Sequence, residues 1–150
     1  DWNGIKIHNS AEDREVVFQY CDISYGGNTE YMIYIQNFYD TEAIDAAVKL
    51  LNCNIHHASS YAIYSSNSGI VLSGTKFSSN WGTNRGLLFY DSYYCVIDNN
   101  QWLRTKEGDN SSRPLELSIW DTSHPGRKIE ITNNAFIDSL GCGYMSPIWL

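Results

Sequence analysis

The sequence is short of basic residues. Ten Lys and Arg stand against seventeen Asp and Glu, which gives a formal net charge of −7 at pH 7, and the longest basic cluster is Arg127-Lys128. Nucleic-acid binding depends on Lys and Arg side chains that neutralise phosphates, so we expect no nucleic-acid partner. The same charge balance disfavours a bare polyanion, whereas neutral glycans fit it more easily.

Long hydrophobic runs, ligand-spaced cysteines and proline are also scarce. No apolar run approaches the roughly 20 residues of a membrane span, so we expect no insertion into a membrane. The opening Asp1-Trp2-Asn3-Gly4 has neither the basic nor the apolar region of a signal peptide. The four cysteines have no CxxC or Cys/His spacing, so we expect no zinc site. We expect free thiols because cysteines stacked in parallel register rarely meet the torsion that a disulfide requires.

The residues that are abundant favour strands. Of the 150 residues 43% are hydrophobic and 14% aromatic, with eleven Tyr and only three Pro. This composition is typical of one folded domain, here residues 1–150, built from extended segments joined by polar turns.

A short pattern recurs five times along the chain. It consists of an apolar residue at i, another at i+2, a small or polar residue at i+5 and an apolar residue at i+7. Its copies are Val16/Phe18/Cys21/Ile23, Val48/Leu50/Cys53/Ile55, Ile70/Leu72/Thr75/Phe77, Cys95/Ile97/Asn100/Trp102 and Ile129/Ile131/Asn134/Phe136. Variable spacing around a constant pattern is typical of a solenoid with loops of different length.

The pattern predicts two strands separated by a bend. Residues at i and i+2 point inward from one strand, and the residue at i+7 points inward from the next. We expect the residue at i+5 to occupy the corner, where Asn tolerates unusual dihedral angles, bonds the turn backbone and stacks on its counterpart in the next rung.

A further strand is predicted between successive copies. The expected strands are residues 4–8, 32–36, 62–66, 86–90 and 115–120. Three short strands per rung follow, so the fold class is all-β, a parallel β-helix of about five rungs. Residues 143–150 predict the start of a sixth rung, and neither end has a polar cap. We therefore expect a segment of a larger protein or assembly.

Two segments carry a family resemblance. Val96-Ile97-Asp98-Asn99-Asn100-Gln101-Trp102 and Ile131-Thr132-Asn133-Asn134-Ala135-Phe136 resemble the I-x-N-N-x-apolar rung signature of right-handed parallel β-helix proteins, the pectate-lyase-like superfamily. The segments 2–7 and 17–27 also resemble rungs of secreted bacterial members. The resemblance implies a secreted or cell-surface location and a saccharide groove on the strand before each bend, but many unrelated activities share this architecture.

Alternation along those strands predicts an outward face with several aromatic side chains. We expect Tyr34, Tyr64 and Tyr90 to stack into a stripe. The candidate ligand-binding residues are Tyr34, Tyr64, Tyr90, Glu116, Trp120, Lys6 and His8. Aromatic faces with polar neighbours suit sugar rings. Tyrosines that merely stack between rungs would give the same pattern.

No catalytic motif is identified, and whether the chain is an enzyme stays open. Hydrolysis of glycans needs two facing carboxylates, and only Glu116 lies on the expected face. The Asp-Asp and Gly-His-Gly motifs of polygalacturonase-like hydrolases and the Asp-Pro-His motif of mannuronan epimerases are absent. Lyase chemistry would require a base, and Lys6, His8 and Arg85 form no recognisable signature.

Cofactor signals are weak. The loop 106–111 has calcium-compatible oxygens without regular ligand spacing, so we expect a polar surface loop. His56-His57 suggests half of a metal site but no third ligand, and we interpret it as a solvated loop pair.

Two functions remain open. The first is an extracellular glycan-associated β-helix that binds, or forms part of a protein active on, polysaccharides. The alternative is a structural segment of a surface fibre, adhesin or phage spike that self-associates through open rungs.

Overall fold

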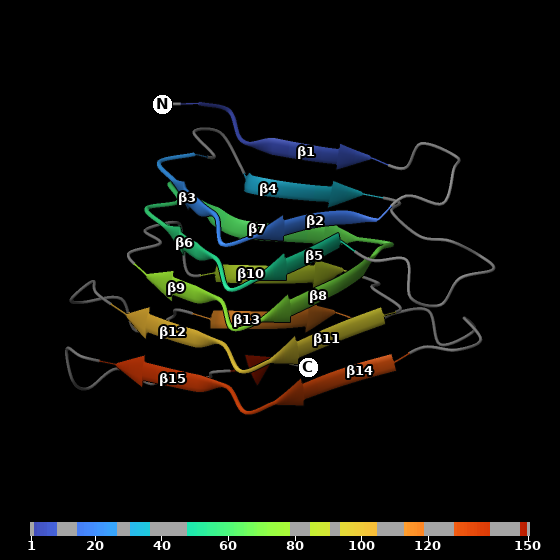
Figure 1. The fold of residues 1–150 in the computed structure, drawn as a ribbon, viewed down its shortest axis with the longest axis vertical. Helices are drawn as coiled ribbons and strands as arrows, with labels where there is room; N and C mark the ends of the chain where they lie inside the picture. The colour runs from blue at the N-terminus through green and yellow to red at the C-terminus, as the bar shows by residue number, and fades with distance from the viewer. Residues whose placement is uncertain are drawn as a thin grey trace.

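The chain folds into three parallel sheets that its strands visit in rotation. The computed structural model describes residues 2–8, 15–26, 31–36, 48–78, 85–90, 94–104, 113–118, 128–138 and 148–149, and the statements below concern those residues. Strands three apart in sequence lie side by side, so that each turn of the chain adds one strand to every sheet (Figure 1).

The first sheet has six strands in the order β1-β4-β7-β10-β13-β16. These strands are β1 (Ile5–His8), β4 (Tyr31–Gln36), β7 (Tyr61–Ser66), β10 (Arg85–Tyr90), β13 (Arg113–Ser118) and β16 (Ile148–Trp149). The last strand lies within the segment expected to begin a sixth rung.

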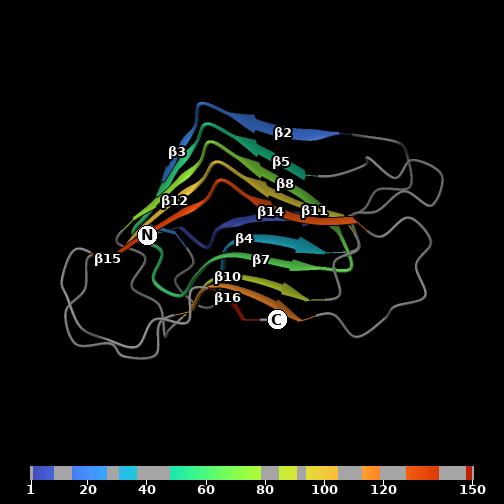
Figure 2. The same ribbon diagram turned by 90° about the horizontal axis from the view of Figure 1, so that it is seen from below.

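The second and third sheets have five strands each and hold the repeated pattern. The second sheet contains β2 (Val16–Gln19), β5 (Val48–Leu51), β8 (Gly69–Ser73), β11 (Tyr94–Asp98) and β14 (Lys128–Thr132). The third sheet contains β3 (Asp22–Ser24), β6 (Asn54–His56), β9 (Lys76–Ser78), β12 (Gln101–Arg104) and β15 (Ala135–Asp138). Figure 2 shows that these two sheets meet at a sharp bend, with the first sheet lying across from them.

The apolar positions of the pattern stack in register. The first position forms one column across the five strands of the second sheet, Val16, Val48, Ile70, Cys95 and Ile129. Phe77, Trp102 and Phe136 form a second column in the third sheet, with ring centroids 5.2 and 4.7 Å apart. The predicted parallel β-helix of about five rungs is therefore confirmed.

The bend between the second and third sheets requires one residue in the left-handed region at every rung. This residue is Tyr20, Asn52, Gly74, Asn99 or Asn133, with φ between 53° and 62°. It stands at i+4 of the pattern, so the prediction that the residue at i+5 takes the unusual dihedral is wrong. The reason is that a left-handed residue at i+4 turns the chain and leaves the i+5 side chain pointing inward.

The inward residue at i+5 hydrogen-bonds the rung before it. Asn100 Oδ1 accepts from the backbone N–H of Thr75 at 2.9 Å, and Asn100 Nδ2 donates to the carbonyl of Leu72 at 3.0 Å. Asn134 repeats both bonds one rung later, to the N–H of Asn100 and the carbonyl of Ile97. This is the stacking role expected for corner Asn.

Other residue types continue this series of hydrogen bonds toward the N-terminus. We call the series formed by the side chains of Asn134, Asn100, Thr75 and Cys53 the bend ladder. Thr75 Oγ1 accepts from the N–H of Cys53 and donates to the carbonyl of Leu50, and Cys53 Sγ donates to the carbonyl of Phe18. Each side chain thus pairs buried backbone groups that the curved chain cannot pair through a strand ladder. Cys21, Cys53 and Cys95 are free thiols, as predicted, and Cys142 lies outside the described residues.

Replacing the central amide of the bend ladder should destabilise the fold. Asn100→Ala leaves the Thr75 N–H and the Leu72 carbonyl without their side-chain partner in a fully buried position. An unpaired buried polar group costs about 1–3 kcal/mol, so we expect the free energy of unfolding to fall by roughly 2–4 kcal/mol. Urea denaturation measures this loss.

The matched control is Asn99→Gly, one residue earlier. Asn99 is exposed and has φ 54°, a conformation that glycine adopts without strain. We expect its free energy of unfolding to stay close to that of the wild type. Equal losses in the two variants would contradict the role of the ladder.

Acid should weaken the bend at the fourth rung. Asp98 Oδ1 accepts hydrogen bonds from Thr132 Oγ1 at 2.7 Å and from Asn133 Nδ2 at 2.9 Å. The bonds from Thr132 and Asn133 lower the pKa of Asp98 below its ordinary value of 3.8. Stabilisation by this carboxylate is therefore complete above that value and lost as the pH falls through the lower pKa of the folded state.

This pH dependence can be measured as the difference in urea midpoint between pH 7 and pH 3. Asp98→Asn should show a smaller drop than the wild type because its side chain does not titrate. An identical drop in both proteins would refute the contribution of Asp98.

Candidate functional site

Four tyrosines gather on β4 and β7 of the first sheet. Tyr34 and Tyr64 are register partners with ring centroids 5.4 Å apart and planes at 21°. Tyr31 lies against both rings, 5.3 Å from Tyr34 and 4.5 Å from Tyr64. Tyr61, the register partner of Tyr31, is 5.4 Å from it. We call these four residues the tyrosine cluster.

The cluster exists because both strands depart from strict alternation. Met32 and Ile33 are both fully buried, as are Ala62 and Ile63 one rung later. Tyr31 and Tyr34 are three residues apart and would face opposite sides of a regular strand. The local break lets their rings meet on one side, where all four tyrosines are half-buried.

Sequence reasoning missed Tyr31 and Tyr61. The spacing Tyr-x-Ile-Tyr occurs at residues 31–34 and again at 61–64, with strand neighbours in the same register. That duplication is a signal in the sequence, but the expected strands began at residues 32 and 62 and left the first tyrosine of each copy out.

The remaining predicted site residues lie at different distances from the cluster. Lys6 is the register partner of Tyr34, and the ring of His8 meets that of Tyr34 edge-on at 5.8 Å. Both side chains are exposed. Tyr90 is also exposed, but it pairs with Ser66, whereas Leu88 pairs with Tyr64. The expected stripe of Tyr34, Tyr64 and Tyr90 therefore does not continue in register, because Tyr90 lies two residues beyond the partner of Tyr64.

Glu116 lies on β13 in register with Leu88, which continues the column of Lys6, Tyr34 and Tyr64. The side chain of Glu116 and the whole of Trp120 lie outside what the structure describes. The loop 106–111 that was weighed for calcium lies outside it as well.

The stacking limits which part of each tyrosine a ligand could meet. The rings of Tyr34 and Tyr64 are stacked with planes at 21°, and Tyr31 lies against both. We therefore expect a ligand to meet mainly ring edges and hydroxyl groups. Burial raises the pKa of Tyr64 above its ordinary value of 10.0, more than its hydrogen bond with Ser66 lowers it. At neutral pH the phenol is thus protonated and can both donate and accept a hydrogen bond.

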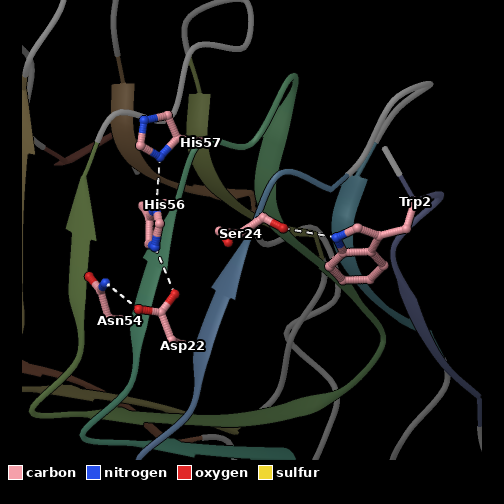
Figure 3. Close-up of polar contacts among 6 residues, drawn as sticks. All are labelled: Trp2, Asp22, Ser24, Asn54, His56 and His57. Atoms are coloured by element: carbon pink, nitrogen blue, oxygen red, sulfur yellow. Dashed lines mark hydrogen bonds and ion pairs between the residues drawn. The ribbon is translucent and has the colours of Figure 1, made fainter.

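A second polar cluster lies on the outer side of the third sheet (Figure 3). His56 Nε2 is 2.7 Å from Asp22 Oδ1, and His56 Nδ1 is 2.6 Å from His57 Nδ1. Asn54 Nδ2 donates to the other carboxylate oxygen of Asp22 at 3.1 Å. Asp22, His56 and His57 form a continuous chain, named below the Asp-His-His chain.

The interpretation of His56-His57 as a solvated loop pair is wrong. His56 belongs to β6, beside β3, and its side chain is only 18% exposed. His57 has φ 56°, a left-handed conformation, and its ring lies against that of His56 with centroids 4.8 Å apart. Successive residues of an extended strand would point to opposite sides, so sequence alone gave no sign of this contact.

Tyr25, which follows β3 on the same rung as Asp22, flanks the Asp-His-His chain. The ring of Tyr25 stacks on His57 at 4.6 Å with planes at 15°, and Tyr25 also has a left-handed φ of 56°. Trp2 Nε1 donates to the carbonyl of Ser24 at 2.8 Å (Figure 3). The site is therefore assembled from β3, β6 and the turns that follow them.

Hydrogen bonding controls the charge of Asp22. Hydrogen bonds from Asn54 and His56, in that order, lower the pKa of this carboxyl below its ordinary value of 3.8, so it is ionised at neutral pH. An ionised carboxylate only accepts hydrogen bonds, hence the proton between the two groups belongs to His56 Nε2.

Two other features are absent from the described segments. These segments contain no group of three or more His, Cys, Asp or Glu side chains arranged to hold a metal ion. They also contain no helix with the length and apolar character needed to cross a bilayer.

Comparison with known proteins identifies the architecture. The model of the family described as right handed beta helix region matches residues 2–145, nearly the whole chain. Searches of curated proteins and of solved structures found no match. The match agrees with three parallel sheets visited in rotation and with the resemblance at the Asn-containing bends. The chain belongs to the right-handed β-helix family.

Proposed function

We propose that this domain binds glycans in an extracellular setting, through the outer side of the first sheet. The observation that carries the proposal is the tyrosine cluster with Lys6 and His8 beside it. Tyrosine combines an apolar ring with a hydroxyl group, which suits the apolar and polar parts of a sugar.

The arrangement favours recognition through hydroxyl groups over broad stacking on a ring. Because the tyrosine rings face one another, a saccharide would run along their edges and exchange hydrogen bonds with several phenols. Lys6 and His8 add exposed hydrogen-bonding groups at one end, and Tyr90 adds an exposed phenol two residues along its strand.

Removing two hydroxyl groups should weaken glycan binding without disturbing the stack. Tyr34→Phe/Tyr64→Phe keeps both rings and deletes only their oxygens. A hydrogen bond contributes about 0.5–1.5 kcal/mol, so we expect affinity to fall roughly 5- to 150-fold for the double variant. A glycan array on the purified chain identifies the ligand, and calorimetry measures the change.

The matched control is Tyr20→Phe, the same change at a tyrosine that is 75% exposed at the bend between β2 and β3. It should bind like the wild type. If no glycan binds the wild type, or if both tyrosine changes have the same effect, glycan recognition at this face is refuted.

We also propose a second function, association between copies through terminal rungs. Val48, Leu50, Ile70 and Leu72 are fully buried inside the stack. The same columns are only partly buried in the outermost described strands, at Val16 and Phe18 on one side and Ile129 and Ile131 on the other. Partly exposed apolar columns on edge strands favour strand-on-strand contact.

Light scattering over a range of concentrations tests association. We expect the average mass to rise with concentration, and Phe18→Lys to reduce that rise because it places a charge in the partly exposed column. Circular dichroism checks that the variant is folded. A wild-type protein that stays monomeric at high concentration would exclude this function.

A further inference from the structure

The two imidazoles of the Asp-His-His chain face each other through their Nδ1 atoms, 2.6 Å apart. We propose that His56 Nδ1 and His57 Nδ1 together bind one divalent transition-metal cation, Cu²⁺ more tightly than Zn²⁺, with Asp22 as a positioning residue. The inference concerns the third sheet and does not depend on glycan binding at the first.

The two nitrogens already converge. Asp22 accepts the proton that His56 carries on Nε2, so Nδ1 is the nitrogen through which this ring can offer a lone pair to a metal. His57 Nδ1 lies 2.6 Å from His56 Nδ1, so the two nitrogens share one proton in a hydrogen bond. An imidazole held by a carboxylate at one nitrogen and aimed at a shared point by the other is the usual arrangement of a metal-ligating histidine.

Binding requires the proton between the two Nδ1 atoms to leave. A shift of this proton to His57 Nε2 frees both lone pairs for the metal and keeps the total charge of the two rings unchanged. Metal–nitrogen bonds of about 2.0–2.1 Å place two adjacent ligands roughly 3 Å apart, so the nitrogens separate by a few tenths of an ångström.

The surroundings favour a cation of this type. Asp22 is ionised and its charge offsets that of the bound ion, whereas the exposed Lys76, which follows Asn54 in the same column, opposes it weakly through solvent. Imidazole ligands suit Cu²⁺, Ni²⁺ and Zn²⁺, and Cu²⁺ stands highest in the general affinity order. Ca²⁺ and Mg²⁺ prefer oxygen ligands and should not bind here.

The test uses the full chain, freed of metal by a chelator, titrated with Cu²⁺, Zn²⁺ and Ca²⁺ by calorimetry. Electron paramagnetic resonance of the Cu²⁺ complex should show two coordinated nitrogens. His57→Asn should abolish this signature and the tight binding. Asparagine tolerates a left-handed φ, so this variant retains the turn, and circular dichroism verifies its fold.

Two further variants separate the roles. Asp22→Asn should lower Cu²⁺ affinity about 10- to 100-fold while keeping the two-nitrogen signature, as expected for a carboxylate that orients a ligand. His8→Asn, at an exposed histidine of the first sheet, should change neither affinity nor spectrum. The proposal is overturned if the wild type binds no Cu²⁺, or if binding survives His57→Asn.

Discussion

The fold depends on the hydrogen bonds that join each bend to the next. A chain that turns sharply between two sheets leaves backbone groups that no strand ladder can pair, and in a solenoid these groups are buried at every rung. The bend ladder pairs them with the side chain one rung later, using Asn134, Asn100, Thr75 and Cys53 in turn. Loops between rungs can therefore differ in length while the bends stay in register.

The same register creates the two candidate sites. Parallel strands without a shift place residues of successive rungs about 4.8 Å apart, which is the distance at which aromatic rings stack. On the first sheet this spacing brings the tyrosines of β4 and β7 together in the tyrosine cluster. Stacked rings present less of their faces to a ligand, so the recognition proposed here would use the ring edges and hydroxyl groups of side chains whose faces pack against one another.

A left-handed residue after a strand of the third sheet has a different effect from one at the bends. At the bend ladder a left-handed residue redirects the main chain and leaves the next side chain inside. At His57 the same backbone conformation follows a strand end and leaves two imidazoles in contact on the outer side. Asp22 reaches His56 from the neighbouring strand, so this polar chain spans two rungs and comes from residues 34 and 35 positions apart in sequence.

The sequence by itself determined the rung. The spacing of Val48, Leu50, Cys53 and Ile55 predicts two strands, a bend and an inward corner residue, because periodicity and turn chemistry are local properties. Only the tertiary structure decided which side chains meet. The break in alternation at Met32 joined Tyr31 to the cluster, register moved Tyr90 beside Ser66, and a left-handed His57 completed the Asp-His-His chain. These outcomes depend on dihedral angles and strand register, which packing of the whole stack determines.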